Sequence, residues 1–123
     1  MSLFSKRRIL SFKYASAGIV KALQKEPNLK FHFLAAWLVV ILGSLLNISR
    51  TDWIILIILI GLVISLELTN TALEEVVDSF TQQEHPGAKL AKDVSAGAVL
   101  VVAITSVIVG LIIFMPYLWT FFP

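Results

Sequence analysis

The chain has 123 residues, of which 58% are hydrophobic, and its mean hydropathy is +0.89. This composition excludes an ordinary soluble globular domain, and the length allows one domain at most, so we interpret residues 1–123 as a single membrane domain. The sequence contains no cysteine, which excludes disulfides, iron–sulfur clusters and cysteine zinc sites.

Basic residues are concentrated at the start of the chain. The net charge is +2, and residues 1–30 hold seven of the ten Lys and Arg residues but only one acid, Glu26. A basic segment beside apolar spans is typical of contact with anionic lipid, and we expect no nucleic-acid partner. The start, MSLFSKRRILSF, lacks a small-residue cleavage site, so we expect it to be retained.

The pattern over residues 5–26 predicts an amphipathic helix that lies on the membrane surface. Its apolar face holds Ile9, Phe12, Ile19 and Leu23, and its polar face holds Arg7, Tyr14, Lys21 and Lys25. This pattern fits a simple membrane anchor as well as a helix that contacts a substrate. Pro27 is expected to end or kink the helix and to leave Glu26 at the break, where an ion pair with a nearby lysine is the plainer interpretation.

Two apolar spans follow, at residues 29–48 and 53–80. Only the polar segment NISRTD connects them, so they are expected to be antiparallel neighbours. His32 lies in the first turns of the first span. We interpret it as a hydrogen-bonded residue of the membrane interface rather than as a ligand.

Carboxylates follow the apolar part of the second span on the same helix. Residues 53–66 have no charge, and the segment ELTNTALEEVVD follows at residues 67–78. At 100° per residue, a stripe within about 80° of arc holds Glu67, Asn70, Glu74 and Asp78. If Trp53 marks one interface, Glu67 lies about 21 Å along the axis, near the far boundary of a hydrocarbon core about 30 Å thick. An acid at that depth is a candidate functional residue, although a helix that emerges into water has the same pattern.

A third helix is predicted over residues 88–119. The loop TQQEHPGA precedes it, KLAKD opens it, and an uncharged stretch follows at residues 94–115. Tyr117 and Trp119 form an aromatic end of the kind found at membrane interfaces. Nine of the ten basic residues lie in the first 30 residues or in residues 81–93. We therefore expect a multi-pass protein of the cytoplasmic membrane, with its N-terminus in the cytoplasm and its C-terminus outside.

The acidic stripe and the Lys92-Asp93 pair are expected at the same membrane boundary. Carboxylates with few ligands each suit Mg²⁺, and a lysine can hold a phosphate as a point charge. The sequence has no Walker loop and no Gly-rich nucleotide loop, which excludes a conventional kinase. A further carboxylate near the lipid could accept a proton from a hydroxyl. Phosphoryl transfer to a lipid alcohol is therefore one option, beside a proton-coupled transporter or an assembly subunit.

Two motifs resemble the signature of the small prokaryotic membrane diacylglycerol kinase family. ELTNTALEEVVD fits the family pattern E-x-x-N-[ST]-A-[IL]-E-x-x-x-D, and HPGAKLAKDVSAGAVL follows at the family's spacing. The segment EPNLKFH, at residues 26–32, is similar to the form found in the Gram-positive branch, whose members resemble undecaprenol kinases. The resemblance runs along nearly the whole chain.

The resemblance implies an all-α integral membrane fold with three transmembrane helices and an N-terminal surface helix, assembled as a homotrimer with shared active sites. It implies an ATP-dependent kinase that phosphorylates undecaprenol with Mg²⁺, with diacylglycerol as the alternative acceptor. The partners would be ATP, a long-chain lipid alcohol, further copies of the chain and the bilayer. A transporter or a noncatalytic subunit is the competing class, although three spans without an inverted repeat offer no continuous pathway.

The family motifs also imply residue roles. Glu67 matches the general base for the lipid hydroxyl, and Glu26 and Glu74 match the carboxylates that hold Mg²⁺ on the ATP phosphates. Lys92 matches a lysine that contacts phosphate. The remaining matches, to nucleotide-binding, headgroup-contacting or other polar site residues, are Arg7, Tyr14, Asn70, Asp78, Gln83, His85 and Asp93.

Overall fold

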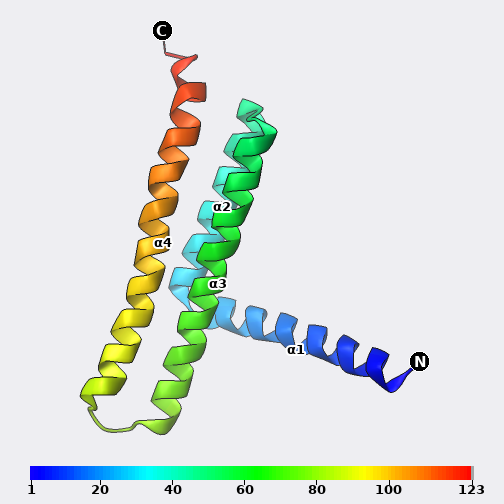
Figure 1. Cartoon of the computed structure of the whole chain (residues 1–123), viewed down its shortest axis with the longest axis vertical. Coiled ribbons are helices and arrows are strands. Elements are labelled where there is room, and N and C mark those ends of the chain that lie inside the picture. The colour runs from blue at the N-terminus through cyan, green and yellow to red at the C-terminus, as the bar shows by residue number, and fades with distance from the viewer. Residues whose placement is uncertain (123) are drawn as a thin grey trace.

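Four helices account for most of the chain. They run in the order α1 (Leu3–Lys25), α2 (Pro27–Leu46), α3 (Arg50–Phe80) and α4 (Pro86–Trp119), in a computed structural model that describes residues 1–122. In Figure 1, α2, α3 and α4 form a bundle, and α1 projects from its side. The expected all-helical fold with three long apolar helices is confirmed. The helix ends lie within three residues of the expected positions.

The break between α1 and α2 has a local cause. Pro27 has no backbone N–H and is the first residue of α2, where a missing donor is tolerated. Glu26 has extended backbone angles, and its N–H donates to the carbonyl of Ala22 at 2.8 Å, which closes the last turn of α1. The sequence prediction that Pro27 ends the first helix is therefore confirmed. The break redirects the chain from the projecting α1 into the bundle.

A tight turn joins α2 to α3 at the other end of the bundle. Asn47 takes the left-handed conformation, with a φ of 50°, which ends α2. Ser49 then caps α3, because its hydroxyl accepts the N–H of Asp52 at 3.1 Å. The two helices are antiparallel neighbours, as the short connection predicts (Figure 1).

The buried core lies at the end of the bundle that holds this turn. Ile48, Leu56, Ile113 and Phe114 form one cluster from the turn, α3 and α4. Tyr117 of α4 adds polar contacts there, because its hydroxyl donates to Asp52 at 2.7 Å and accepts the N–H of Ser49 at 3.0 Å. Tyr117 is therefore a structural partner of the turn as well as part of an aromatic end.

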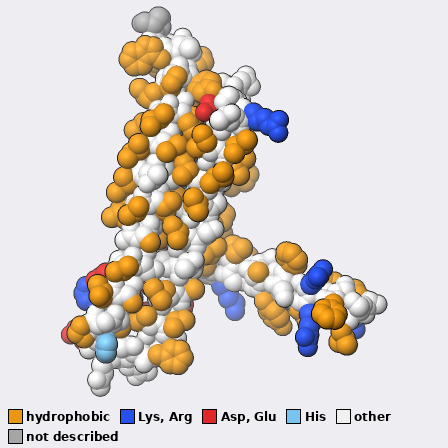
Figure 2. Space-filling view, viewed as in Figure 1, with side chains coloured by type: hydrophobic (Ala, Val, Ile, Leu, Met, Phe, Trp, Pro, Cys, Tyr) orange, Lys and Arg blue, Asp and Glu red, His pale blue; other side chains and the backbone are white. Residues whose placement is uncertain are grey.

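The sides of the bundle are apolar. The helices α2, α3 and α4 each have the length and hydropathy needed to cross a membrane. Figure 2 shows hydrophobic side chains along the bundle, with charged side chains gathered toward its ends and along α1. Large residues such as Trp37, Ile57 and Ile112 are more than half exposed. This is the surface that a multi-pass membrane protein presents to lipid.

The helix α1 has no buried residue. It contacts α2 and α3, and Figure 1 shows its N-terminal end far from the bundle. Apolar Phe12 and polar-face Tyr14 are both largely exposed. The placement of α1 on a membrane surface stays a prediction.

Candidate active site

The acidic stripe lies on one uninterrupted helix. Because α3 is helical throughout Arg50–Phe80, the four stripe residues share one side of it over about 16 Å of axis. Their environments differ along this length. Glu67 is buried, Asn70 and Glu74 are half-buried, and Asp78 is exposed. The stripe therefore runs from the interior of the bundle to its open end, which is the end where the loop at residues 81–85 connects α3 to α4.

Glu67 is paired with a histidine from α2. The Nε2 of His32 lies 3.1 Å from the Oε1 of Glu67, and the two side chains are 16% and 7% exposed. The backbone carbonyl of Glu67 also accepts the hydroxyl of Thr71 at 3.0 Å. The sequence placed His32 at the membrane interface without a named partner, and the structure brings its ring to the buried end of the stripe. The sequence signal for this contact was the position of His32, a titratable residue in the second turn of the helix that begins at Pro27.

Asn70 and Glu74 form the middle of the stripe. The amide nitrogen of Asn70 contacts Oε1 of Glu74 at 3.4 Å. Among residues 1–122, the Oδ1 of Asn70 is the one buried side-chain oxygen or nitrogen without a hydrogen-bond partner. Native proteins pair nearly all such atoms, so an unpaired oxygen beside a carboxylate fits a bound cation or donor at this position.

The oxygen donors at this position fit Mg²⁺ better than a metal that prefers nitrogen or sulfur. No group of three or more His, Cys, Asp or Glu side chains within residues 1–122 could enclose a metal ion. Mg²⁺ does not need such a cage, because it keeps waters and binds through one or two carboxylates together with phosphate oxygens. Glu74 is thus a carboxylate that could hold a magnesium ion together with water and phosphate oxygens.

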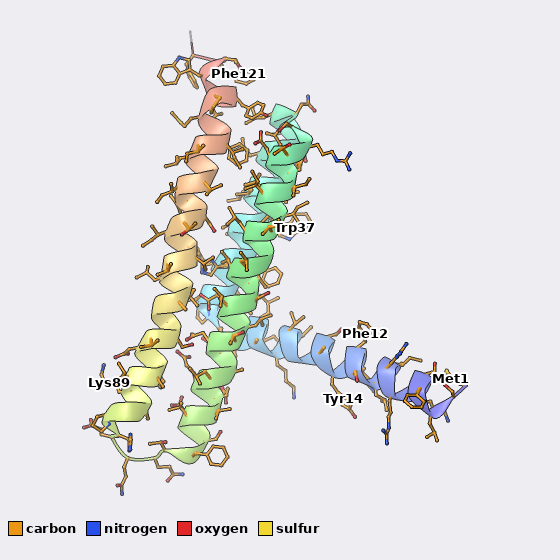
Figure 3. All side chains as sticks on the ribbon, in the orientation of Figure 1. Met1, Phe12, Tyr14, Trp37, Lys89 and Phe121 are labelled. Carbon is orange, nitrogen blue, oxygen red and sulfur yellow. The ribbon has the colours of Figure 1, made fainter. Side chains whose placement is uncertain are left out.

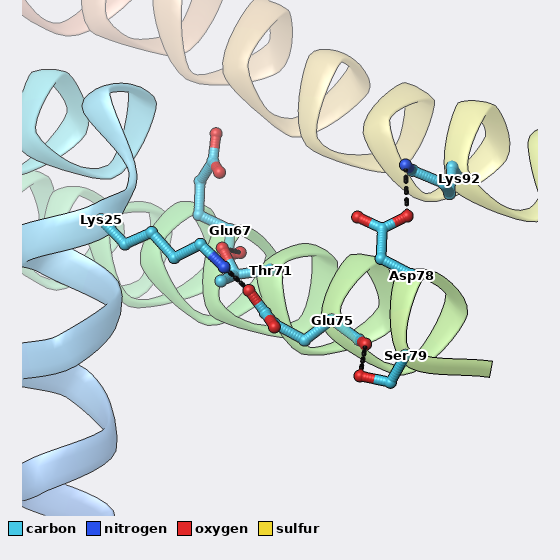
Figure 4. Close-up of polar contacts among 7 residues, drawn as sticks. All are labelled: Lys25, Glu67, Thr71, Glu75, Asp78, Ser79 and Lys92. Atoms are coloured by element: carbon cyan, nitrogen blue, oxygen red, sulfur yellow. Dashed lines mark hydrogen bonds and ion pairs between the residues drawn. The ribbon is translucent and has the colours of Figure 1, made fainter. Parts of the chain in front are cut away.

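Lysine and aspartate side chains join α3 to α4 at the open end of the bundle. The Nζ of Lys92 donates to Oδ1 of Asp78 at 2.9 Å (Figure 4). Asp93 pairs instead with Lys89, four residues earlier on the same helix. The sequence placed Lys92 and Asp93 near the stripe, and the structure brings Lys92 to it directly.

A hollow of about 710 Å³ lies between the ends of α3 and α4 and their connecting loop. Five of the residues singled out from the sequence line it, namely Asp78, Gln83, His85, Lys92 and Asp93. His85 also caps α4, because its Nδ1 accepts the backbone N–H groups of Gly87 and Ala88 at 3.1 and 3.2 Å. Capping occupies Nδ1 and leaves Nε2 for a ligand.

The helix α1 reaches the stripe only at its C-terminal end. Lys25 forms an ion pair with Glu75 of α3 (Figure 4), which places the α1–α2 break beside the stripe. Glu26 at that break is half-buried and makes no ion pair within residues 1–122. The plainer interpretation of Glu26 as an ion-paired residue is therefore wrong, because Lys25 turns toward α3 instead.

Arg7 and Tyr14 are not brought to the site within one chain. Figure 3 shows Tyr14 on the projecting part of α1, away from the bundle, and Arg7 lies two turns nearer the N-terminus on the same helix. Both side chains are exposed. Any role for them in this site requires a neighbouring copy of the chain or a rearranged α1.

A second hollow, of about 400 Å³, lies between α2, α3 and α4. Its lining is almost entirely apolar, and it includes His32, Val63 and Phe114. It therefore extends from the buried end of the stripe toward the hydrophobic core.

Comparison with known proteins identifies the family. The model of the prokaryotic diacylglycerol kinase family matches residues 13–114. The chain is 49% identical over 108 residues to the undecaprenol kinase of Bacillus subtilis, covering 88% of each chain. It is 42% identical over 109 residues to a diacylglycerol kinase of Synechocystis, covering 88% of this chain and 62% of that one. It is 30% identical over 116 residues to the diacylglycerol kinase of Escherichia coli K12, covering 94% and 92%.

The family match covers the end of α1, the α1–α2 break, the acidic stripe and most of α4. The residues that the structure assembles at the open end of the bundle thus lie inside the matched region, whereas Arg7, which is remote from this site, lies outside it. This chain belongs to the prokaryotic diacylglycerol kinase family.

Proposed function

We propose that this protein is an ATP-dependent lipid kinase that phosphorylates the hydroxyl of undecaprenol at the cytoplasmic face of the membrane. One observation carries the proposal. A buried carboxylate, Glu67, stands at one end of a polar stripe, and Lys92 stands at the other end beside a hollow. Such a transfer needs a carboxylate that accepts the proton of the alcohol and a cation that stabilises the negative charge of the phosphate.

The donor binds at the open end of the bundle. The hollow lined by Gln83, His85 and Lys92 takes the nucleoside, and the stripe leads inward from it. A nucleoside triphosphate is elongated, so its phosphates extend along α3 past Asp78 and Glu74 toward Glu67. Lys92 leaves Asp78 in part and contacts a phosphate oxygen as a point charge.

Magnesium would bind together with the phosphates of ATP. Glu74 and Glu26 are the carboxylates that would hold it. The unpaired Oδ1 of Asn70, a side chain that contacts Glu74, would be a further oxygen ligand. Bound there, the ion would neutralise charge on the phosphates.

The acceptor approaches from the lipid. Its hydroxyl reaches Glu67 at the membrane boundary, and its tail stays in apolar surroundings such as the hollow that His32 and Val63 line. Glu67 takes the hydroxyl proton as the oxygen attacks the terminal phosphate in line, and ADP leaves on the opposite side.

Undecaprenol is the acceptor that the relatives favour. The Bacillus subtilis enzyme at 49% identity is an undecaprenol kinase, whereas the diacylglycerol kinases of Synechocystis and Escherichia coli K12 are 42% and 30% identical. Diacylglycerol is the second candidate, because it is also a neutral alcohol on long apolar tails.

The assembly is part of the proposal. Because Arg7 and Tyr14 are remote from the site of their own chain, they act on a neighbouring subunit of a homotrimer. The arm and the α3–α4 loop, which hold nine of the ten basic residues, face the cytoplasm, and the C-terminus lies outside.

An acceptor comparison tests the function. The purified full-length protein is assayed with radiolabelled ATP and Mg²⁺ against undecaprenol and diacylglycerol in matched mixed micelles. We expect a higher kcat/KM for undecaprenol. A higher value for diacylglycerol would replace the acceptor, and no transfer to either lipid by an intact oligomer would favour a noncatalytic subunit.

A further inference from the structure

We propose that His32 is a positioning residue for Glu67, and that it fixes which carboxylate oxygen meets the acceptor hydroxyl. The inference rests on the proposed function, in which Glu67 is the base. It assigns a role to a residue of α2 that neither the sequence motifs nor the family comparison assigns.

His32 and Glu67 are close enough to interact directly. The Nε2 of His32 is 3.1 Å from Oε1 of Glu67, which is hydrogen-bond distance for an imidazole N–H and a carboxylate oxygen. Both side chains are largely buried. Attraction between an imidazole and a carboxylate at this distance is stronger in such surroundings than in water, so it favours one rotamer of the glutamate side chain.

The two carboxylate oxygens of Glu67 differ in their surroundings. Within residues 1–122, Oε1 contacts His32, and no protein donor reaches Oε2. Oε2 is not sealed in the protein either, because the described residues contain only one buried side-chain polar atom without a partner, and it belongs to Asn70. Oε2 is therefore the oxygen that remains open to accept a proton.

The start of α2 holds His32 in place. The ring stands in the second turn of α2, directly after the break at Pro27, and Leu29 in the first turn is fully buried. The rings of Phe31 and His32 meet in an edge-to-face arrangement, with centroids 5.7 Å apart. The start of α2 is thus anchored against the bundle, which keeps the imidazole aimed at α3.

The consequence is a rate effect without a binding effect. Glutamate has three rotatable side-chain bonds, and without a partner its carboxylate samples several positions. A displacement of about 1 Å at a reacting group can lower the rate by about 100-fold. ATP binds some turns further along α3, at Lys92 and the hollow, so its KM should not change.

Two isopolar substitutions provide the test. In His32→Gln, the amide nitrogen reaches about as far as the imidazole Nε2 and can still donate to Glu67. In His32→Asn, the amide has the same chemistry but stops short, at about the position of Nδ1. His32→Leu removes the donor, and Leu34→Ala, at an exposed residue of the same turn, controls for general damage to α2.

The variants are assayed as full-length protein in mixed micelles, with kcat and the KM for ATP measured separately. Each is assayed with whichever of undecaprenol and diacylglycerol the wild type phosphorylates faster. A wild-type preference for diacylglycerol thus corrects the proposed acceptor without affecting the inference. Thermal unfolding and oligomer size are recorded for every variant.

We expect His32→Gln and Leu34→Ala to keep kcat within a few-fold of the wild type. We expect His32→Asn and His32→Leu to lose about 100-fold in kcat with an unchanged KM for ATP. If His32→Leu fails to fold, the comparison of kcat between His32→Gln and His32→Asn still tests the positioning role. Equal kcat values for these two variants, or a wild-type kcat in folded His32→Leu, would overturn the positioning role.

Discussion

Lys92 of α4 and Asp78 of α3 form an ion pair, 2.9 Å between Nζ and Oδ1, that joins the two helices at the open end of the bundle. The pair lies on the wall of the larger hollow, so a phosphate that enters there meets a lysine already held toward α3. In the proposed function, the aspartate keeps the lysine in place before the donor binds and competes with the phosphate for it afterwards.

This arrangement predicts effects of unequal size on kcat/KM for substitutions of the two partners. Lys92→Met removes the charge that faces the phosphate, and we expect kcat/KM for ATP to fall about 100-fold. Asp78→Asn leaves the lysine present but less well held, and we expect a smaller fall. Steady-state kinetics with varied ATP at saturating lipid measures both. An Asp78→Asn variant more impaired than Lys92→Met would show that the aspartate, and not the lysine, contacts the donor.

Adjacent acids on α3 provide a matched pair for the metal prediction. Glu74 belongs to the stripe and contacts Asn70, whereas Glu75 points to α1 and pairs with Lys25. We expect Glu74→Ala to raise the concentration of Mg²⁺·ATP needed for half-maximal rate, with a much smaller change in the KM for the lipid. Glu75→Ala should leave both unchanged. Equal weakening of nucleotide and lipid in Glu74→Ala would argue against a metal role.

The same ion pair between Lys25 and Glu75 makes a prediction about stability. Both side chains are more than half exposed, so the pair is screened by water and is worth about 1 kcal/mol at most. Glu75→Ala should therefore shift the thermal midpoint by only a few degrees. A loss of the folded oligomer in this variant would mean that the α1–α3 contact is shielded in the assembly.

The hydroxyl of Tyr117 should matter for stability and not for catalysis. It donates to Asp52 and accepts from Ser49 at the end of the bundle that holds the core, away from the stripe. Hydrogen bonds to a charged group contribute about 1.5–3 kcal/mol, so we expect Tyr117→Phe to lower the free energy of unfolding by about 1.5 kcal/mol. Its kcat should match that of the wild type. Denaturant titration in micelles and the lipid kinase assay measure the two quantities.

The remote position of Arg7 predicts complementation between inactive chains. If Arg7 serves a neighbouring subunit, a mixture of Arg7→Ala and Lys92→Met chains contains some sites in which both residues are intact. Co-assembled mixtures should then recover a fraction of wild-type activity that neither variant shows alone. Mixed oligomers that stay as inactive as the separate variants would place Arg7 outside a shared site.

Features that depend on a short stretch of the chain could be predicted from the sequence. The stripe on α3 follows from a period of 3.6 residues, and the end of α1 follows from the missing N–H of Pro27. The antiparallel pair α2 and α3 follows from a short polar connection. These predictions are confirmed because the local sequence determines each of them.

Contacts between helices could not be predicted in the same way. The pairing of His32 with Glu67 depends on the rotation and the axial position of α2 against α3, which periodicity within either helix does not determine. The same holds for Lys25, which left Glu26 without an ion pair by turning to Glu75. The sequence predicted Lys92 and Asp93 near the stripe, but it did not predict their individual partners, which are Asp78 for Lys92 and Lys89 for Asp93.

The most direct test concerns the carboxylate of Glu67. Glu67→Gln keeps the size and the hydrogen-bonding ability of the side chain but cannot accept the proton of an alcohol at neutral pH. Binding of a fluorescent ATP analogue and phosphorylation of undecaprenol are measured on the same folded preparation. The account predicts unchanged nucleotide affinity with turnover reduced by at least 100-fold. Near-normal turnover in this variant would contradict it.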